Sequence, residues 1–185
     1  MEKIKIKSLS IVFPFFNEEK RIKKSLDKIS RMLTKLGIEK TEIILVNDGS
    51  NDQSDLIIKK FIKDLNFQKR KKINYIKYLK NMGKGYACKK GVSVARNRWV
   101  LTCDIDFSAN PTEILNWSKK NLIKSNNECY FGSRNIDGSK IKYRIYRRFL
   151  GKIFSKFRNY LFNINILDTQ CGFKLYPKKI AKKIF

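Results

Sequence analysis

The chain has 185 residues, a formal net charge of +26 and no histidine. Without histidine, Ser-His-Asp triads, histidine metal ligands and imidazole acid–base catalysis are excluded. Any acid–base or metal chemistry must therefore use carboxylates, which suit hard cations such as Mg²⁺ or Mn²⁺. The charge would attract nucleotides, phospholipid headgroups or nucleic acid, although a general bias toward lysine explains part of it.

The cysteines and the apolar segments bear on the compartment. Cys88, Cys103, Cys129 and Cys171 form no C-x-x-C pair, which favours buried free thiols in a reducing compartment. No stretch approaches the ~20 continuous apolar residues of a membrane span, and the start of the chain does not resemble a signal peptide. We therefore expect a cytoplasmic protein, or one that lies peripherally on the cytosolic face of a membrane.

Four short apolar runs predict buried strands, each followed by a polar loop. The first run is expected to stop at Pro14, and the second leads directly into N-D-G-S at 47–50. The predicted strands are 9–13, 42–46, 73–78 and 98–103.

Helical patterns separate these strands. The first helix begins at Glu18 and ends near Gly37, and the second is capped by Asn51 or Asp52. The third follows the glycine-bearing loop at 81–85 and carries small residues that allow close packing on a sheet. The apolar stripes are Ile22, Leu26, Ile29, Leu33 and Leu36 in the first helix, and Leu56, Ile58, Phe61, Ile62 and Leu65 in the second; the small residues of the third are Ala87, Gly91 and Ala95.

This alternation predicts an α/β fold with a mostly parallel sheet and helices on both faces. In such sheets, ligands bind outside the carboxyl ends of the strands. Polar residues follow every predicted strand, and we expect them to meet at one edge of the sheet. They are Asn17, Glu18, Asn47, Asp48, Lys84, Asp104 and Asp106.

Asp104 and Asp106 are the main candidates for metal binding. Two carboxylates separated by one residue at a strand end can hold one divalent cation against the phosphates of a nucleotide. Asp48 can accept hydrogen bonds from a base or ribose, and Lys84 adds positive charge beside a phosphate. Each motif alone also fits an ordinary turn, in which Asn and Asp side chains bond the local backbone.

The joint pattern resembles the family 2 glycosyltransferases over essentially the whole chain. It consists of P-F-F-N-E-E at 14–19, V-N-D-G-S at 46–50, N-M-G-K-G at 81–85, D-I-D at 104–106 and G-S-R at 132–134. The segment D-T-Q-C-G-F-K-L at 168–175 is similar to the dolichyl-phosphate glucosyltransferase branch, which is close to the dolichyl-phosphate mannosyltransferases. Ser108 stands where mannosyltransferases have Gln, which disfavours that sister branch.

The resemblance implies a GT-A nucleotide-sugar-binding fold and inversion at the sugar carbon. It implies that Asp104 and Asp106 meet the metal and the diphosphate beside the Ile105 backbone, and that Arg134 contacts a phosphate. Phe16 stands where relatives often have Tyr, so stacking remains while a phenolic hydrogen bond is lost. The residues implied to contact the nucleoside are Pro14, Phe16, Glu18, Val46 and Asp48.

A lipid phosphate acceptor agrees with the lack of histidine. A phosphate is already anionic at neutral pH, so it can attack the sugar carbon without a strong base. A glycan hydroxyl would need a base, for which the candidate is Asp168. Asp168 fits equally well as the residue that bonds the backbone of the turn at 169–172.

The segment 141–162 is basic and rich in aromatic residues, with apolar residues at steps of four. It predicts a basic amphipathic helix suited to anionic headgroups and a polyprenyl tail. Arg147 or Arg148 could clamp the acceptor phosphate. A helix packed on the core with a solvated basic face explains the pattern equally well.

The sequence as a whole predicts a single domain over residues 1–185. Its predicted activity is transfer of a hexose, in the first place glucose, from a UDP-sugar to polyprenyl or dolichyl phosphate with Mg²⁺ or Mn²⁺. The alternatives are transfer to a glycan hydroxyl, a nucleotide-sugar-binding protein without activity, and a basic nucleic-acid-binding protein, although no specific nucleic-acid motif appears. Relatives usually continue beyond the segment at 168–175, so we expect C-terminal elements to be lacking.

Overall fold

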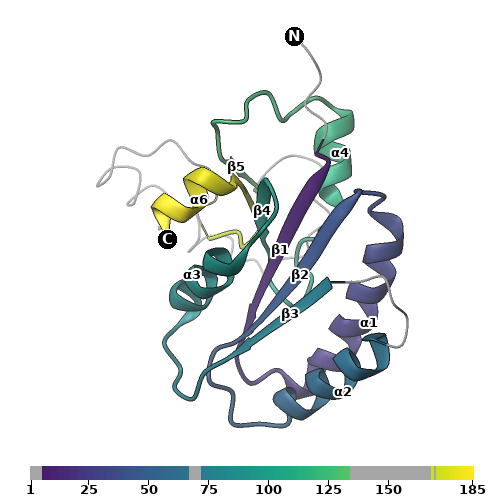
Figure 1. Ribbon diagram of the computed structural model, residues 1–185, viewed down its shortest axis with the longest axis vertical. Coiled ribbons are helices and arrows are strands. Elements are labelled where there is room, and N and C mark those ends of the chain that lie inside the picture. Colours follow the sequence, from purple (N-terminus) through teal and green to yellow (C-terminus); the bar gives the residue numbers. More distant parts are fainter. Residues whose placement is uncertain (1–5, 67–71, 134–167, 169) are drawn as a thin grey trace, which may run out of the picture. The chain divides into compact units, whose positions relative to one another are not determined.

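The computed structural model describes residues 6–66, 72–133, 168 and 170–185. The chain packs as two compact units, Met1–Tyr130 with Phe173–Phe185, and Phe131–Gly172. The elements in chain order are β1 (Ser8–Phe15), α1 (Glu19–Lys35), β2 (Lys40–Asn47), α2 (Ser54–Asn66), β3 (Lys72–Lys77), α3 (Lys84–Val94), β4 (Trp99–Thr102), α4 (Glu113–Lys119), β5 (Tyr130–Phe131), β6 (Lys174–Pro177) and α6 (Lys178–Ile184) (Figure 1).

The strands form one six-stranded sheet in the order β3-β2-β1-β4-β6-β5. β1 pairs in parallel with β2 and β4, and β2 pairs in parallel with β3. β6 runs antiparallel to β4, with Thr102 opposite Lys174. The predicted α/β fold with a mostly parallel sheet is therefore confirmed, and the antiparallel β6 is an addition that the sequence analysis did not predict.

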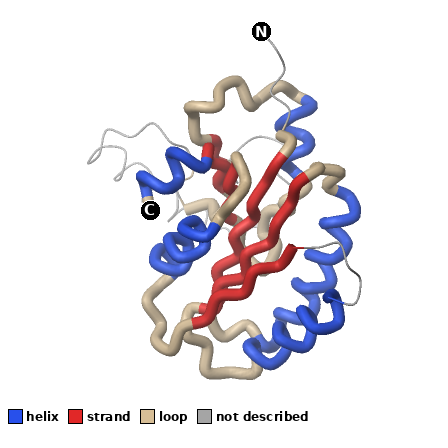
Figure 2. Tube along the Cα trace, in the orientation of Figure 1, coloured by secondary structure: helices blue, strands red, loops and turns tan. Residues whose placement is uncertain are grey.

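Helices cover both faces of the sheet. Figures 1 and 2 show α3 and α6 on one side and α1 and α2 on the other. Residues at alternate positions of a strand point to the same face of the sheet. Val12 of β1 and Val46 of β2 both point to the face that α3 covers and belong to the buried cluster beneath this helix. A Cβ added at Gly91 of α3 would lie 2.3 Å from Val12 Cγ1. The small residue therefore allows α3 to approach the sheet closely, as its spacing predicts.

β1 does not stop at Pro14 as predicted. It continues to Phe15, and Pro14 lies opposite Val46 of β2. The carbonyl of Phe15 accepts a bond from Asp48 beyond β2, whereas that of Val12 accepts one from Cys103 beyond β4. The nitrogen of Pro14 thus faces the β4 side, where strand pairing has already ended after Val12. The missing N–H therefore costs no bond of the ladder.

Two predicted helix faces need correction. Leu56 was expected on the apolar stripe of the second helix, but it is 62 % exposed, whereas Ile58 is fully buried. In the first helix Met32 is buried, while Leu33 is only partly so. The predicted helix at 141–162 lies outside the described residues. Apolar spacing therefore locates these helices well but assigns their faces only to within one residue.

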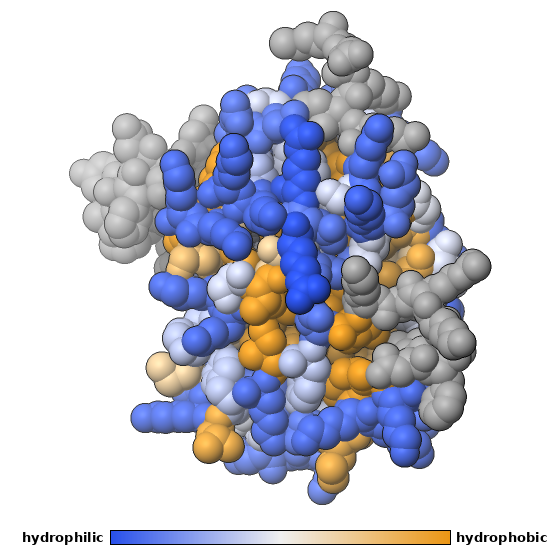
Figure 3. All heavy atoms as spheres, viewed as in Figure 1, coloured by the Kyte–Doolittle hydropathy of each residue, from blue (hydrophilic) through white to orange (hydrophobic). Residues whose placement is uncertain are grey.

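The surface reflects the large positive charge. Hydrophilic residues predominate on the face drawn in Figure 3, and hydrophobic residues reach the surface where Figure 1 draws β2 and β3. Within the part of the chain that the structure describes, no helix is long and apolar enough to cross a bilayer.

Candidate functional site

A cleft of about 370 Å³ opens at the carboxyl edge of the sheet, within the size range of small-molecule sites. The loops that follow β1, β2 and β3 come together in the lower part of Figure 1. We call this site the carboxyl-edge cleft. Eight of the predicted site residues line it, namely Pro14, Phe16, Glu18, Asp48, Lys84, Asp104, Ile105 and Asp106.

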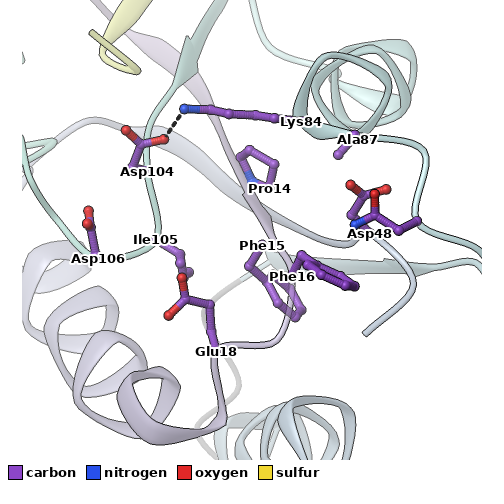
Figure 4. Close-up of a pocket in the computed structure, with 12 residues that line it drawn as sticks. Pro14, Phe15, Phe16, Glu18, Asp48, Lys84, Ala87, Asp104, Ile105 and Asp106 are labelled. Carbon is purple, nitrogen blue, oxygen red and sulfur yellow. Dashed lines mark hydrogen bonds and ion pairs between the residues drawn. The ribbon is translucent and has the colours of Figure 1, made fainter. Parts of the chain in front are cut away.

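Asp104 and Asp106 lie together at one end of the cleft, across Pro14 from Asp48 (Figure 4). Lys84, the first residue of α3, reaches across the cleft and forms an ion pair with Asp104 Oδ1. Asp106 Oδ1 accepts hydrogen bonds from the backbone N–H and the hydroxyl of Ser108. Partial burial raises the pKa of Asp106, but the bonds from Ser108 and the charges of Arg21 and Lys28 together outweigh it and lower this pKa overall. The carboxylate is therefore held in its charged form.

The turn that carries these two carboxylates is fixed by Phe107. Phe107 has a positive φ of 61°, which is rare for a bulky residue. Its ring stacks on Phe13 of β1 with centroids 5.6 Å apart, and its N–H donates to the carbonyl of Asp104 at 3.1 Å. The ammonium group of Lys28 lies over the same Phe107 ring, 5.5 Å from its centroid. The turn is thus tied to the sheet and to α1.

The carboxylate pair fits a hard divalent cation. Mg²⁺ commonly binds to one or two protein carboxylates and completes its shell with water and substrate phosphates. The described residues contain no cluster of three or more His, Cys, Asp or Glu that would form a closed protein site. Within the described part of the chain, Asp104 and Asp106 would therefore hold a cation together with further ligands, such as water and substrate phosphates.

Asp48 lies at the other end of the cleft with one oxygen engaged. Its Oδ1 accepts bonds from the Tyr78 hydroxyl at 2.6 Å and the Met82 N–H at 2.9 Å. Burial and the bond to Asp48 raise the pKa of Tyr78, which keeps this hydroxyl a donor. No described residue donates to Oδ2. Every buried side-chain oxygen among the described residues has a hydrogen-bond partner, so an oxygen without a partner must be exposed to solvent. Oδ2 is therefore accessible as an acceptor.

The neighbouring Asn47 has the turn-forming role that the sequence left open for both residues. Its Oδ1 accepts from the Ser50 N–H at 2.8 Å, and its Nδ2 donates to the Tyr75 hydroxyl at 2.9 Å. The Tyr75 hydroxyl in turn donates to Asp55 Oδ1 at 2.6 Å. Asp48 is thereby left available to the cleft.

Asp55 is the buried end of this chain of hydrogen bonds. Its second oxygen accepts from Lys77 at 2.7 Å and Lys59 at 3.1 Å. Burial raises the pKa of Asp55, but the bonds from Lys77, Tyr75 and Lys59 outweigh it and lower this pKa to about 2. The loop after β2 therefore rests on an ionised, fully bonded carboxylate.

The loop after β1 and the loop after β2 are locked together by five hydrogen bonds. Asn17 adopts a positive φ of 51°, which asparagine tolerates better than most residues. The bonds run from Asn17 N to Ser50 Oγ, Glu18 N to Ser54 Oγ, Glu19 N to Asp52 Oδ2, Asn51 N to Asn17 Oδ1 and Gln53 N to Glu19 Oε2, at 2.9 to 3.0 Å. Sequence reasoning missed the two serines, whose only signal was their place in the N-D-G-S-N-D-Q-S segment.

Gly49 brings the loop after β2 against the loop after β3. Its φ is +72°, and an added Cβ would lie 2.5 Å from the Lys80 carbonyl carbon and 2.6 Å from the Asn81 nitrogen. Only glycine fits this close approach of two backbones. The glycine therefore positions Asp48 beside the loop that leads into α3.

The amino end of α3 faces the cleft. Gly83, with a φ of 87°, precedes the helix, and no side chain caps it. The first hydrogen bond of the helix runs from the Ala87 N–H to the Gly83 carbonyl at 3.1 Å. The preceding N–H groups have no acceptor within the helix and, together with the helix dipole, favour an anion.

Of the remaining predicted residues, Val46 does not line the cleft, Asp168 belongs to the second unit, and the others lie outside the described residues. Val46 is fully buried in the core beneath α3, so its side chain does not reach the cleft. Asp168 Oδ1 accepts from the N–H groups of Gln170 and Cys171, both at 3.1 Å, which is the turn-forming role. Arg134, Arg147 and Arg148 lie outside the described residues.

Comparisons with known proteins agree with this geometry. The family model for glycosyl transferase family 2 matches residues 10–185. The dolichyl-phosphate beta-glucosyltransferase ALG5D of Trichomonas vaginalis is 32% identical over 188 residues, covering 96% of this chain and 55% of its own length. The Homo sapiens dolichyl-phosphate beta-glucosyltransferase is 31% identical over 189 residues, covering 97% and 57%. The chain thus spans a little over half the length of these relatives.

Solved structures share the fold. Glucosyl-3-phosphoglycerate synthase of Mycobacterium tuberculosis, solved with Mn²⁺, UDP and glucosyl-3-phosphoglycerate, has a TM-score of 0.59 and 18% identity, covering 94% of this chain and 58% of its own. TarS residues 1–349 of S. aureus has a TM-score of 0.60 and 18% identity, covering 96% and 49%. The expected GT-A fold is therefore confirmed.

Proposed function

The chain belongs to glycosyl transferase family 2, and we propose that it transfers glucose from UDP-glucose to dolichyl phosphate or a related polyprenyl phosphate. The observation that carries this proposal is the carboxyl-edge cleft, where eight of the expected donor-site residues come together. The dolichyl-phosphate beta-glucosyltransferases among the relatives support the sugar and the lipid. Because the family match spans nearly the whole chain, we treat residues 1–185 as a single family 2 domain.

The nucleoside would occupy the end of the cleft near Asp48. The accessible Oδ2 of Asp48 can accept a hydrogen bond from the uracil N–H or a ribose hydroxyl. Phe16 is 43 % exposed at the cleft, so its ring is available to stack on the base. Tyr78 and Met82 hold Asp48 in place, so little side-chain freedom is lost on binding.

The diphosphate would lie between the amino end of α3 and the aspartate pair. Asp104 and Asp106 would hold Mg²⁺ or Mn²⁺, which would neutralise charge on the departing UDP. The Mn²⁺ and UDP in the similar synthase structure support a divalent metal. Lys84 now pairs with Asp104. When a cation and a diphosphate bind, the ammonium group of Lys84 can turn from Asp104 to a phosphate oxygen. There it would stabilise the negative charge of the departing UDP.

The acceptor phosphate would attack the anomeric carbon from the side opposite the UDP. One phosphate oxygen forms the new bond to this carbon while the bond to the UDP oxygen breaks, with inversion. No proton needs to be removed from the nucleophile, so no strong base is required. Asp168 fits this account as a turn-forming residue, because its Oδ1 already accepts two backbone hydrogen bonds.

The acceptor side of the site rests on residues outside the described part. We retain Arg134 as a phosphate contact, Arg147 and Arg148 as candidates for the acceptor phosphate, and 141–162 as a basic amphipathic helix. Such a helix would place the enzyme peripherally on a membrane, where the lipid acceptor is found. The lipid substrate in the names of the relatives supports a membrane surface, and we retain the cytosolic face as part of the proposal.

The direct test is incubation of the chain with radiolabelled UDP-glucose, dolichyl phosphate and Mn²⁺, followed by extraction into organic solvent. We expect label in the organic phase, and none when EDTA replaces the metal. A parallel reaction with a glycan hydroxyl acceptor tests the competing family activity. Label in that glycan alone, or no transfer by folded protein with metal present, would overturn the proposal.

A further inference from the structure

A second pocket, of about 510 Å³, lies at the amino edge of the sheet. Arg96 and Arg98 on its lining precede β4, and Pro177 pairs with Trp99 at the start of that strand. The carboxyl-edge cleft instead follows the strand ends, and the two sites share no lining residue. We call this second site the amino-edge pocket.

The segment that carries Arg96 and Arg98 is held rigidly. The N–H of Arg96 donates at 2.6 Å to Glu42, a carboxylate that is itself buried. Both arginines line the pocket, whereas the Asn97 side chain is turned to the backbone of β1, where it donates to the Leu9 carbonyl at 2.9 Å. The remaining bonds run from Asn97 N to Ser10 Oγ and from Arg98 N to Ser8 Oγ, both at 3.1 Å.

The start of α6 forms the second wall. The N–H of Lys178 donates to the Arg98 carbonyl at 2.8 Å, and its ammonium group donates to the Arg96 carbonyl at 2.9 Å. Lys179 also lines the pocket, and it is exposed. Four cationic side chains thus gather on two backbone segments that bond directly to each other.

The third wall comes from Asn126 and Asn127 in the loop before β5. The Tyr130 hydroxyl fixes this loop, because it accepts from the N–H groups of Lys124 at 2.9 Å and Ser125 at 2.7 Å. The two asparagine amides add neutral hydrogen-bond donors. None of the described residues that line the pocket is acidic.

We propose that the amino-edge pocket binds a phosphate-bearing anion, as a phosphomonoester or phosphodiester group. Guanidinium groups match phosphate oxygens in a bidentate geometry, and two of them lie on a backbone that needs no rearrangement. The pocket is concave and of small-molecule size, rather than the extended basic stripe expected for a nucleic-acid surface. The same chemistry would be met by a soluble phosphate ester or by a lipid headgroup at a membrane surface.

The test compares wild type with R96Q/R98Q, which removes both guanidinium groups while leaving every backbone bond of the segment intact. The matched control is K23Q/K24Q, which removes the same charge from exposed lysines of α1. Thermal unfolding verifies that each variant is folded, and the single variant R98Q replaces the double variant where folding fails. One arm measures binding of inorganic phosphate by amide chemical shifts; the other measures co-sedimentation with phosphatidylcholine vesicles with and without phosphatidylglycerol.

We expect saturable phosphate binding, with shifts at residues 96–98 and 126–127, or binding to the anionic vesicles. Affinity should fall about tenfold or more in R96Q/R98Q and stay within about twofold in the control. Loss in the phosphate arm alone identifies a soluble phosphate site, and loss in the vesicle arm alone identifies a headgroup site. Binding in neither arm, or an equal loss in K23Q/K24Q, would overturn the proposal, since attraction would then be absent or due to net charge.

Discussion

The two edges of the sheet present opposite charges to a ligand. The carboxyl-edge cleft has four acidic residues and a single lysine on its described lining, whereas the amino-edge pocket has four cationic residues; the acidic residues are Glu18, Asp48, Asp104 and Asp106. Phosphate groups are repelled by the first set unless a cation is added, and attracted directly by the second. Phosphate binding should therefore depend on a metal at the carboxyl edge and proceed without one at the amino edge.

The two edges are also supported in a similar way. At the amino edge the buried Glu42 accepts the N–H of Arg96. At the carboxyl edge Asp55 accepts the Tyr75 hydroxyl, which reaches the loop after β2 through Asn47. Each edge therefore has a carboxylate away from the ligand that fixes a loop, so both sites are formed before a ligand arrives.

The largest predicted effect separates the edges by their metal requirement. D104N/D106N removes both carboxylates proposed to hold the cation, and we expect glucose transfer to fall about a thousandfold. Inorganic phosphate binding at residues 96–98 should be unchanged. The control D27N/D64N removes two carboxylates on α1 and α2 that do not line the cleft, and retained transfer in D104N/D106N would refute the metal assignment.

The next effect tests how the carboxyl edge is assembled. G49A places a Cβ 2.5 Å from the Lys80 backbone at a positive φ, and it should lower the free energy of unfolding by about 3 kcal/mol in urea titrations. Gly37 also has a positive φ, but an added Cβ would meet no atom within 4 Å. G37A should therefore lower the free energy of unfolding by only about 1 kcal/mol. Equal losses would show that strain alone, rather than the close approach of two loops, explains the glycine.

A third prediction concerns pH and the support beneath the cleft. The pKa of Asp55 is lowered from 3.8 to about 2, chiefly by Lys77 and Tyr75 acting against burial. The folded state therefore gains about 2 kcal/mol from this group above pH ~4, and this gain disappears as the pH falls through about 2. The difference in unfolding free energy between wild type and D55N should shrink over that range. A constant difference from pH 7 to pH 2 would contradict this account.

The smallest predicted effect concerns Lys84. K84Q keeps a polar side chain but removes the charge proposed to meet the diphosphate, so UDP affinity with Mn²⁺ should fall about tenfold by calorimetry. K89Q, an exposed lysine further along α3, is the control. If K84Q instead tightens metal binding without weakening UDP, Lys84 acts only as a partner of Asp104.

Much of this organisation follows from local sequence patterns. The parallel strands, the close packing at Gly91 and the meeting of Asp48, Lys84 and Asp104 were predicted, because strand ends in a parallel sheet share one edge. The strand at 42–46 was predicted to be buried, but a run that is apolar throughout does not show which face each side chain takes, so the position of Val46 beneath α3 was not predicted. Its face is set by the order of strands in the sheet, which periodicity does not contain.

Other features depend on contacts between distant segments. The bonds from Asn17 to Ser50 and from Glu18 to Ser54 join residues more than thirty positions apart. The antiparallel β6 and the pairing of Lys178 with Arg96 likewise appear only when the chain closes back on β4. A single sequence shows that such polar residues exist, but not which of them meet.

A crystal structure of the chain soaked with UDP-glucose and Mn²⁺ would show directly whether the carboxyl-edge cleft is the donor site. We predict the uracil beside Phe16 and Asp48, and Mn²⁺ between the diphosphate and the carboxylates of Asp104 and Asp106. Nucleotide bound at Arg96 and Arg98 instead, with the carboxyl-edge cleft empty, would contradict the assignment of this cleft as the donor site.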